Sequence, residues 1–138
     1  MENQNQKELV VLIDDESDIL ENYSYVFQKN DFDVVTFSNG NSALEYLRTN
    51  LDKVSLIISD FHMPNGNGHS VAQYVRKHGM KNYPIMYFLS GYTSVDIEEK
   101  GWNLGYELIR KPIRSKDLLE KVLVALGERP PRPPRPQA

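Results

Sequence analysis

The amino-acid sequence predicts an α/β domain in which helices cover both faces of a parallel sheet. Short apolar runs rich in valine and isoleucine recur along the chain, and helical patterns separate them. Such runs are typical of strands buried on both faces, and their strict alternation with helices is typical of βαβ units.

The predicted elements alternate from residue 9 to residue 126. Strands are expected at 9–13, 33–37, 55–59, 85–89 and 107–110, and helices at 16–29, 41–49, 68–78, 95–101 and 116–126. Apolar stripes are clearest in the first and last helices, at Ile19, Leu20, Tyr23, Val26 and Phe27, and at Leu118, Leu119, Val122, Leu123 and Leu126. The helix at 95–101 has few apolar residues, so we expect it to be the most mobile.

Length and composition favour a single folded domain. The chain has 138 residues, of which 40% are hydrophobic, and it contains no cysteine. These values exclude a disulfide framework and a thiolate metal site. The first eight residues are polar, and no run approaches the roughly 18 apolar residues that a membrane span needs. A cytoplasmic location is therefore expected.

The last residues differ in composition from the rest. Residues 128–138 hold three arginines, one glutamate and five of the eight prolines. This stretch has a charge of +2, and because the whole chain has a net charge of −3, the rest of the chain has a charge of −5. We expect a disordered segment at 1–8, one folded domain at 9–127 and a proline- and arginine-rich tail or linker at 128–138. An acidic body is not expected to bind nucleic acid. The tail could also be a ligand for an aromatic-lined groove.

Charged residues stand at the ends of three predicted strands. Asp14 and Asp15 follow the first, Asp60 follows the third, and Lys111 follows the fifth. The carboxyl ends of parallel strands meet at one edge of the sheet, where ligands of open α/β sheets bind. Three carboxylates gathered there resist ionisation unless a cation lies among them. An all-oxygen site favours a hard ion such as Mg²⁺.

Simpler interpretations exist for each residue. Asp14 or Asp15 could cap the helix that starts at Glu16, Ser90 could be a turn residue, and Lys111 could be a surface charge. Their ordered positions after successive strands argue against these interpretations. Three histidines, His62, His69 and His78, show no metal-ligand spacing and are expected to face solvent. Trp102 either covers the edge of the core or contacts a partner.

Features in this order resemble the response-regulator receiver domain, the CheY-like module of two-component signalling, from Leu9 to Gly127. They are Asp14-Asp15-Glu16, Asp60 with Met63-Pro64 and Gly68 downstream, Ser90, and Lys111-Pro112. The resemblance implies a flavodoxin-like (βα)5 fold, with a doubly wound five-stranded parallel sheet in the order 2-1-3-4-5.

The resemblance also implies a phosphoacceptor signalling domain rather than an enzyme. Asp60 would take a phosphoryl group from a histidine kinase or phosphotransfer protein and form an aspartyl phosphate. Asp15, Asp60 and the backbone carbonyl of His62 would bind Mg²⁺ directly, and Asp14 would contribute through water. Lys111 would supply a fixed positive charge opposite the ion.

A second set of residues is implied in switching. Ser90 would donate a hydrogen bond to the phosphoryl group, and Gly91 would leave room for that movement. Tyr92 and His62 would flank the phosphoryl group and tune its hydrolysis. The family often has an aromatic residue three positions before the lysine; Leu108 stands there, and Tyr106 is two residues earlier on the same strand face. The signal would pass through the elements at 95–101, 107–110 and 116–126 to a partner.

Two rival functions remain. A pseudo-receiver would keep the fold and bind partners without phosphate. A haloacid-dehalogenase-type phosphatase also forms an aspartyl phosphate, but it needs a second acid two residues after the nucleophile, where His62 stands.

Overall fold

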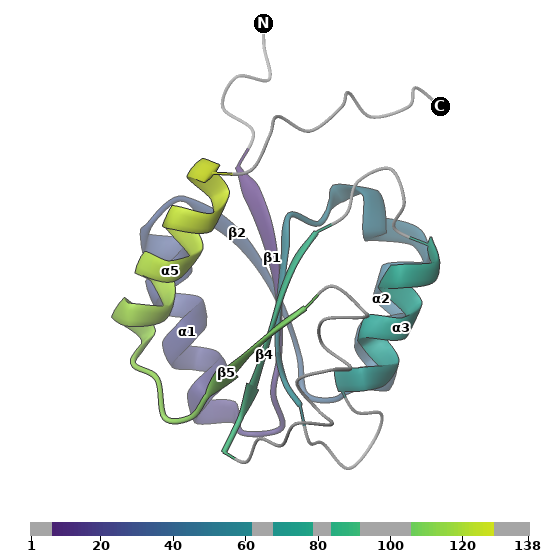
Figure 1. Cartoon of the computed structure of the whole chain (residues 1–138), viewed down its shortest axis with the longest axis horizontal. Helices are drawn as coiled ribbons and strands as arrows, with labels where there is room; N and C mark the ends of the chain where they lie inside the picture. The colour runs from purple at the N-terminus through teal and green to yellow at the C-terminus, as the bar shows by residue number, and fades with distance from the viewer. Residues whose placement is uncertain (1–6, 62–67, 79–83, 92–105, 129–138) are drawn as a thin grey trace, which may run out of the picture.

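The computed structural model describes residues 7–61, 68–78, 84–91 and 106–128 (Figure 1). Within these ranges the elements are β1 (Glu8–Ile13), α1 (Ser17–Lys29), β2 (Phe32–Phe37), α2 (Gly40–Asn50), the 3-10 helix η1 (Leu51–Lys53), β3 (Leu56–Asp60), α3 (Gly68–His78), β4 (Ile85–Ser90), β5 (Glu107–Arg110) and α5 (Ser115–Glu128). The alternation of strands and helices is confirmed. The helix predicted at 95–101 lies outside the described residues, as does Trp102.

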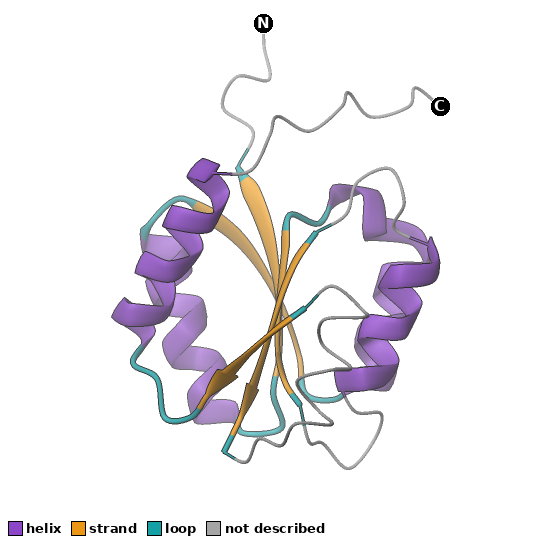
Figure 2. Cartoon of the chain, in the orientation of Figure 1, coloured by secondary structure: helices purple, strands orange, loops and turns teal. Residues whose placement is uncertain are grey.

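All five strands form one parallel sheet in the order β2-β1-β3-β4-β5 (Figure 2). This is the predicted flavodoxin-like order 2-1-3-4-5. Strand β1 lies between β2 and β3, with Val10 paired with Val34 of β2 on one side and with Leu56 of β3 on the other. The chain therefore reverses its winding direction between β1 and β3, and the carboxyl ends of those two strands lie next to each other.

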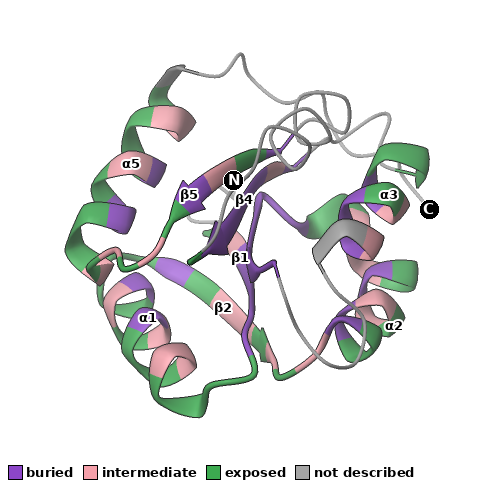
Figure 3. Ribbon diagram, turned by 60° about the horizontal axis from the view of Figure 1, so that its bottom comes forward, coloured by how far each residue is buried: buried purple, intermediate pink, exposed green. Residues whose placement is uncertain are grey.

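Helices cover both faces of the sheet. In Figure 1, α1 and α5 lie on one side of the strands and α2 and α3 on the other. Strands β3 and β4 are buried along nearly their whole lengths, as Figure 3 shows for β4. Side chains alternate between the two faces of each strand, so these apolar runs supply two separate cores.

The two cores are defined by their buried residues. The α2–α3 cluster contains Val11, Ile13, Ala43, Leu47, Val54, Ile57, Phe61, Val71, Ala72, Val75, Met86, Phe88 and Tyr106. The α1–α5 cluster contains Val10, Leu12, Tyr23, Phe27, Phe32, Leu56, Ile58, Tyr87, Leu89, Ile109, Leu118, Leu119 and Val122. Successive residues of β1 and β3 enter opposite clusters, which fixes the register of both strands.

Several details differ from the sequence prediction, three of them near the site or in the core. Strand β3 covers Leu56–Asp60 rather than 55–59, because Asp60 pairs with Leu89 in the ladder with β4. Ser90 is likewise the last residue of β4 rather than the first after it. Leu123, expected in the apolar stripe of α5, is 49% exposed, because it lies at the margin of a stripe centred on Leu118, Leu119 and Val122.

Among the described residues, no helix has the length and apolar character needed to cross a membrane.

Candidate phosphoacceptor site

The candidate site lies at the carboxyl edge of the sheet, where hydrogen bonds between neighbouring strands hold it. The N–H of Asp14 donates to the carbonyl of Phe37 at 3.1 Å, which ties the end of β1 to the end of β2. The N–H of Lys111 donates to the carbonyl of Ser90 at 2.8 Å, which ties the end of β5 to the end of β4. These hydrogen bonds fix the backbone at the carboxyl ends of β1, β2, β4 and β5, where the candidate site lies.

Three aspartates meet at this edge. Asp14, Asp15 and Asp60 each offer one carboxylate oxygen, and these atoms lie within 4.8 Å of one another. Asp14 is 3% exposed and Asp60 9% exposed, whereas Asp15 is open to solvent. The structure thus brings together the three acids that the sequence placed at strand ends, and it distinguishes two buried acids from one exposed acid.

Lys111 faces both buried acids. Its ammonium nitrogen lies 3.5 Å from Oδ1 of Asp60 and 3.9 Å from Oδ2 of Asp14. The lysine side chain is only partly exposed, so solvent screens these contacts less than it screens a surface ion pair. The interpretation of Lys111 as a mere surface charge is therefore wrong.

Burial raises the pKa of Asp14 to about 6. A backbone hydrogen bond from Glu16 and the charge of Lys111 oppose this shift, and the neighbouring charges of Asp60 and Asp15 add to it. The hydrogen bond runs from the N–H of Glu16 to Oδ1 of Asp14 at 2.9 Å, just before α1 begins. The N-cap of α1 is Glu16 itself, so Asp14 does not cap the helix; it accepts a hydrogen bond from the residue before the helix and belongs to the acidic cluster.

The residues expected to switch are placed in part. Ser90 is 1% exposed at the end of β4. Among the described residues, no atom lies within 4 Å of a Cβ added at Gly91, the next residue, so they leave open space beside the backbone there. Tyr92, and His62 with the remainder of the loop after Phe61, lie outside the described residues.

Tyr106 and Leu108 both contact the α2–α3 cluster, as the alternation of strand faces predicts. The ring of Tyr106 is 6% exposed and meets Phe88 edge to face, with 4.6 Å between centroids. Phe61, the residue directly after Asp60, lies 5.9 Å from both rings. An aromatic group formed by Phe61, Phe88 and Tyr106 thus begins one residue from the candidate phosphoacceptor.

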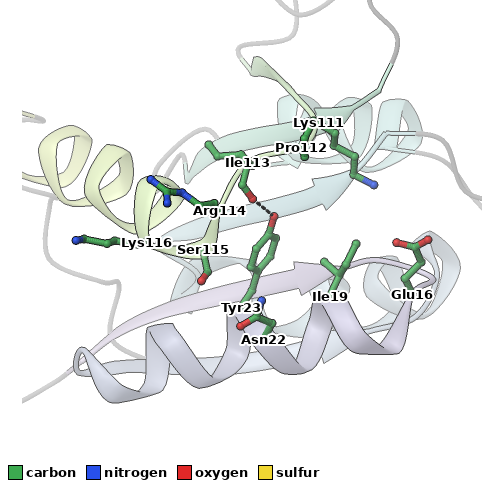
Figure 4. Close-up of a pocket in the computed structure, with 10 residues that line it drawn as sticks. All are labelled: Glu16, Ile19, Asn22, Tyr23, Lys111, Pro112, Ile113, Arg114, Ser115 and Lys116. Carbon is green, nitrogen blue, oxygen red and sulfur yellow. Dashed lines mark hydrogen bonds between the residues drawn. The ribbon is translucent and has the colours of Figure 1, made fainter.

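A cleft opens beside the acidic cluster, between α1 and the loop that joins β5 to α5 (Figure 4). Its volume is about 740 Å³, and its lining is Glu16, Ile19, Asn22, Tyr23, Lys111, Pro112, Ile113, Arg114, Ser115 and Lys116. Figure 4 shows Glu16 and Lys111 at one end of the cleft and Arg114 and Lys116 toward the other. The lysine of the site therefore also borders a surface that a partner can reach.

Comparison with known proteins identifies the family. The model of the response regulator receiver domain matches residues 10–123. The chain belongs to the response regulator receiver domain family. The CpxR homolog of Haemophilus influenzae, a transcriptional regulatory protein, is 28% identical to this receiver domain over 118 residues, which is 85% of this chain and 49% of that protein. The transcriptional regulatory protein TdiR of Thauera aromatica is 29% identical over 120 residues, or 86% of this chain and 51% of that protein.

The fold of this receiver domain has solved counterparts. The chemotaxis response regulator CheY4 of Vibrio cholerae superimposes with a TM-score of 0.76, covers 86% of this chain and 98% of its own, and is 24% identical in sequence. The chain spans about half the length of the two curated relatives named above. Our prediction that the acidic body does not bind nucleic acid stays a prediction.

Membership of the family indicates which partners and which metal ion belong to such a site. Receiver domains are signalling modules that interact with histidine kinases or phosphotransfer proteins, and they bind Mg²⁺ at their acidic pocket. The described residues suit that ion, because the three acids supply only oxygen ligands and two of them are buried. Burial disfavours the ionised form of Asp14, and a divalent cation nearby would restore it.

Two contributors near the site were missed by the sequence analysis. Phe61 was passed over because no motif marks it, although its place directly after Asp60 is visible in the sequence. Tyr23 was counted only as part of an apolar stripe. Its hydroxyl donates to the carbonyl of Ile113, 90 residues away, at 3.0 Å, and no local pattern signals such a contact.

Proposed function

We propose that this receiver domain accepts a phosphoryl group on Asp60 from a histidine kinase or phosphotransfer protein. One observation carries the proposal: the Asp60 carboxylate lies 3.5 Å from the Lys111 ammonium and within 4.8 Å of two further carboxylates, at the edge of a buried strand. A nucleophile for phosphoryl transfer needs this combination of a fixed position and nearby groups that neutralise charge.

The proposed metal ligands are Asp15, Asp60 and the backbone carbonyl of His62, with Asp14 acting through water. Mg²⁺ bound there would neutralise charge on the phosphoryl oxygens. The exposure of Asp15 suits a ligand that reaches an ion with several waters, and the burial of Asp14 beside Lys111 suits a supporting role.

The chain's own groups have separate tasks in the proposed transfer. An oxygen of Asp60 attacks phosphorus, and the P–O bond forms as the P–N bond to the donor imidazole breaks, with the nitrogen keeping the bonding electron pair. Lys111 neutralises charge on a phosphoryl oxygen from the side of β5. The hydroxyl of Ser90 donates a hydrogen bond to another phosphoryl oxygen. The open space at Gly91 leaves room for the backbone to approach the phosphoryl group.

The cleft beside Lys111 supports approach of the phosphodonor. It exposes apolar side chains of α1 and the loop after β5 directly next to the acidic cluster. A protein that presented phosphohistidine from this side would reach Asp60 past the lysine.

The output is proposed to pass through the face formed by residues 95–101, β5 and α5. Leu108 stands where the family often has an aromatic residue. Tyr106 is proposed to respond to phosphorylation in its place, because its ring contacts that of Phe61. Helix α5 exposes Leu123 and Val124, at 49% and 59%, which suits contact with a partner.

Labelling by acetyl phosphate tests the proposal. The protein should gain one phosphoryl group by intact mass when Mg²⁺ is present, and chelation of Mg²⁺ should prevent the gain. Asp60→Asn should abolish labelling, and Asp52→Asn, a change at an exposed acid of η1, should leave it intact. Labelling that persisted in Asp60→Asn would contradict the assignment, and no labelling of the wild type would favour a pseudo-receiver.

A further inference from the structure

We infer that Tyr23 is a positioning residue for the phosphoryl-transfer site, because its hydroxyl holds the loop that carries Lys111. The inference rests on the proposed function of Asp60 and Lys111. It goes beyond that function because it assigns a role to a residue of α1 outside the acidic cluster.

The position of Lys111 depends on a short stretch of backbone after β5. The lysine N–H is held by the carbonyl of Ser90 at 2.8 Å, which fixes the end of the strand. Two residues later the carbonyl of Ile113 accepts the hydroxyl of Tyr23 at 3.0 Å (Figure 4). Lys111 therefore lies between two hydrogen bonds, one to a neighbouring strand and one to a helix.

The second hydrogen bond crosses the cleft. Figure 4 shows the Tyr23 ring rising from α1 toward the loop, with Ile19 and Glu16 on one side of it. Between the two hydrogen bonds, Pro112 lines the cleft and is exposed. Ile113 is partly buried against the α1–α5 cluster, so packing of its side chain acts together with the Tyr23 hydroxyl. The tyrosine is thus a polar link between α1 and this loop.

The chemistry of the phenol suits a permanent link. Tyr23 is 8% exposed, and its pKa is raised first by burial and second by the negative charge of Asp14. The hydroxyl therefore stays protonated and remains a donor at neutral pH. An aliphatic residue would fill the same space in the α1–α5 cluster but would leave the Ile113 carbonyl without this donor.

Correct placement of Lys111 matters because small displacements reduce its effect on the transferring group. Its ammonium lies 3.5 Å from Asp60, so a loop shift of an ångström would change the contact substantially. Without the hydroxyl, the loop would keep the Ser90 contact and the packing of Ile113, but the lysine would have more positions. The expected consequence of losing the Tyr23 hydroxyl is slower phosphoryl transfer without loss of the fold.

Tyr23→Phe isolates the hydroxyl, because the ring and its packing are kept. With acetyl phosphate and Mg²⁺, we expect Tyr23→Phe to be labelled about threefold to tenfold more slowly than wild type, the range that one hydrogen bond supports. Tyr46→Phe is the matched control, since Tyr46 is a partly buried tyrosine packed against the opposite cluster. Its labelling rate should equal that of wild type.

A double-mutant cycle separates positioning from general destabilisation. In a Lys111→Met background, Tyr23→Phe should cause no further slowing, because the group that it positions is gone. Equal labelling rates of Tyr23→Phe and wild type would overturn the inference. An undiminished effect of Tyr23→Phe in the Lys111→Met background would overturn it as well.

A second measurement does not depend on phosphorylation. The side-chain ¹³Cε and ¹⁵Nζ resonances of Lys111 should shift in Tyr23→Phe and stay unchanged in Tyr46→Phe. Unchanged Lys111 resonances in Tyr23→Phe would refute the positioning role even if the wild type took up no phosphoryl group. Failure of the wild type to be labelled would instead refute the proposed function.

Discussion

The ammonium nitrogen of Lys111 lies 3.5 Å from Oδ1 of Asp60, although β4 separates the strands that carry the two residues. The contact is possible because both side chains leave the same edge of the sheet, and the lysine is long enough to pass the end of β4. The proposed acceptor thus has a positive partner even without a phosphoryl group.

Replacement of this lysine should slow phosphoryl transfer. Lys111→Met keeps the length of the side chain and removes its charge, so labelling by acetyl phosphate should slow by about tenfold or more. Lys116→Met is a matched control, because Lys116 lines the same cleft and is exposed. An unchanged rate in Lys111→Met would remove the lysine from the transfer step.

Magnesium affinity should depend on pH through Asp14. Its pKa is raised to about 6, so the carboxyl group is largely protonated below that pH and ionised above it. A cation binds the ionised form, so Mg²⁺ affinity should rise with pH through about 6 and level off above it. Calorimetric titration between about pH 5 and 8 measures this. Asp14→Asn should bind more weakly and lose this pH dependence; a dependence kept in the variant would assign it to another group.

Asp15 offers a different test, because it is the exposed member of the acidic cluster. Asp15→Ala should weaken Mg²⁺ binding by about tenfold or more if its carboxylate contacts the ion, with little effect on stability. Isothermal calorimetry measures the affinity, and Asp18→Ala in the first turn of α1 serves as a control. Equal affinities in wild type and Asp15→Ala would exclude direct coordination by this residue.

The ring of Tyr106 should contribute to stability as well as to any response. Tyr106→Leu removes its contacts with Phe88 and Phe61, so the free energy of unfolding should fall by about 1–3 kcal/mol. Urea denaturation measures this. Tyr25→Leu, at a residue that is 63% exposed, should change stability by less than about 0.5 kcal/mol. A comparable loss of stability in both variants would mean that the contacts among Phe61, Phe88 and Tyr106 do not contribute more to folding than an exposed ring does.

Removal of residues 129–138 should leave both melting temperature and labelling rate nearly unchanged. The sequence predicts that this proline-rich segment buries little apolar area. Figure 1 also shows α5 ending at the edge of the sheet where β1 begins, whereas Asp60 is the last residue of β3, at the carboxyl edge. Thermal melting and acetyl phosphate labelling of the shortened chain are the measurements. A fall of several degrees would show that the segment docks on the domain.

Much of the fold could be predicted because its signals are local. The apolar run before Asp14 is buried on both faces, and the period of α1 places Tyr23 and Phe27 on one side. Element ends shifted by one or two residues where the ladder decides them: Asp60 looks like the first residue after a strand, yet its pairing with Leu89 makes it the last residue within one.

The site could be predicted only to the level of strand ends. Adjacent aspartates at the end of β1 look equivalent in the sequence, and only the approach of β2 and Lys111 buries Asp14 and leaves Asp15 exposed. The link between Tyr23 and Ile113 joins residues far apart in the chain, so periodicity reveals the ring's burial but not the partner of its hydroxyl.

The sheet divides the interior into two compartments that share backbone but no side-chain volume. A substitution that changes the size of a residue such as Phe27 is absorbed on one side, while Phe88 and its neighbours on the other side keep their packing. Energetic effects from opposite compartments should therefore add. The two faces can accordingly change in sequence independently of each other. The strand ends that carry Asp60 and Lys111 are the part of the domain that substitutions on either face can affect.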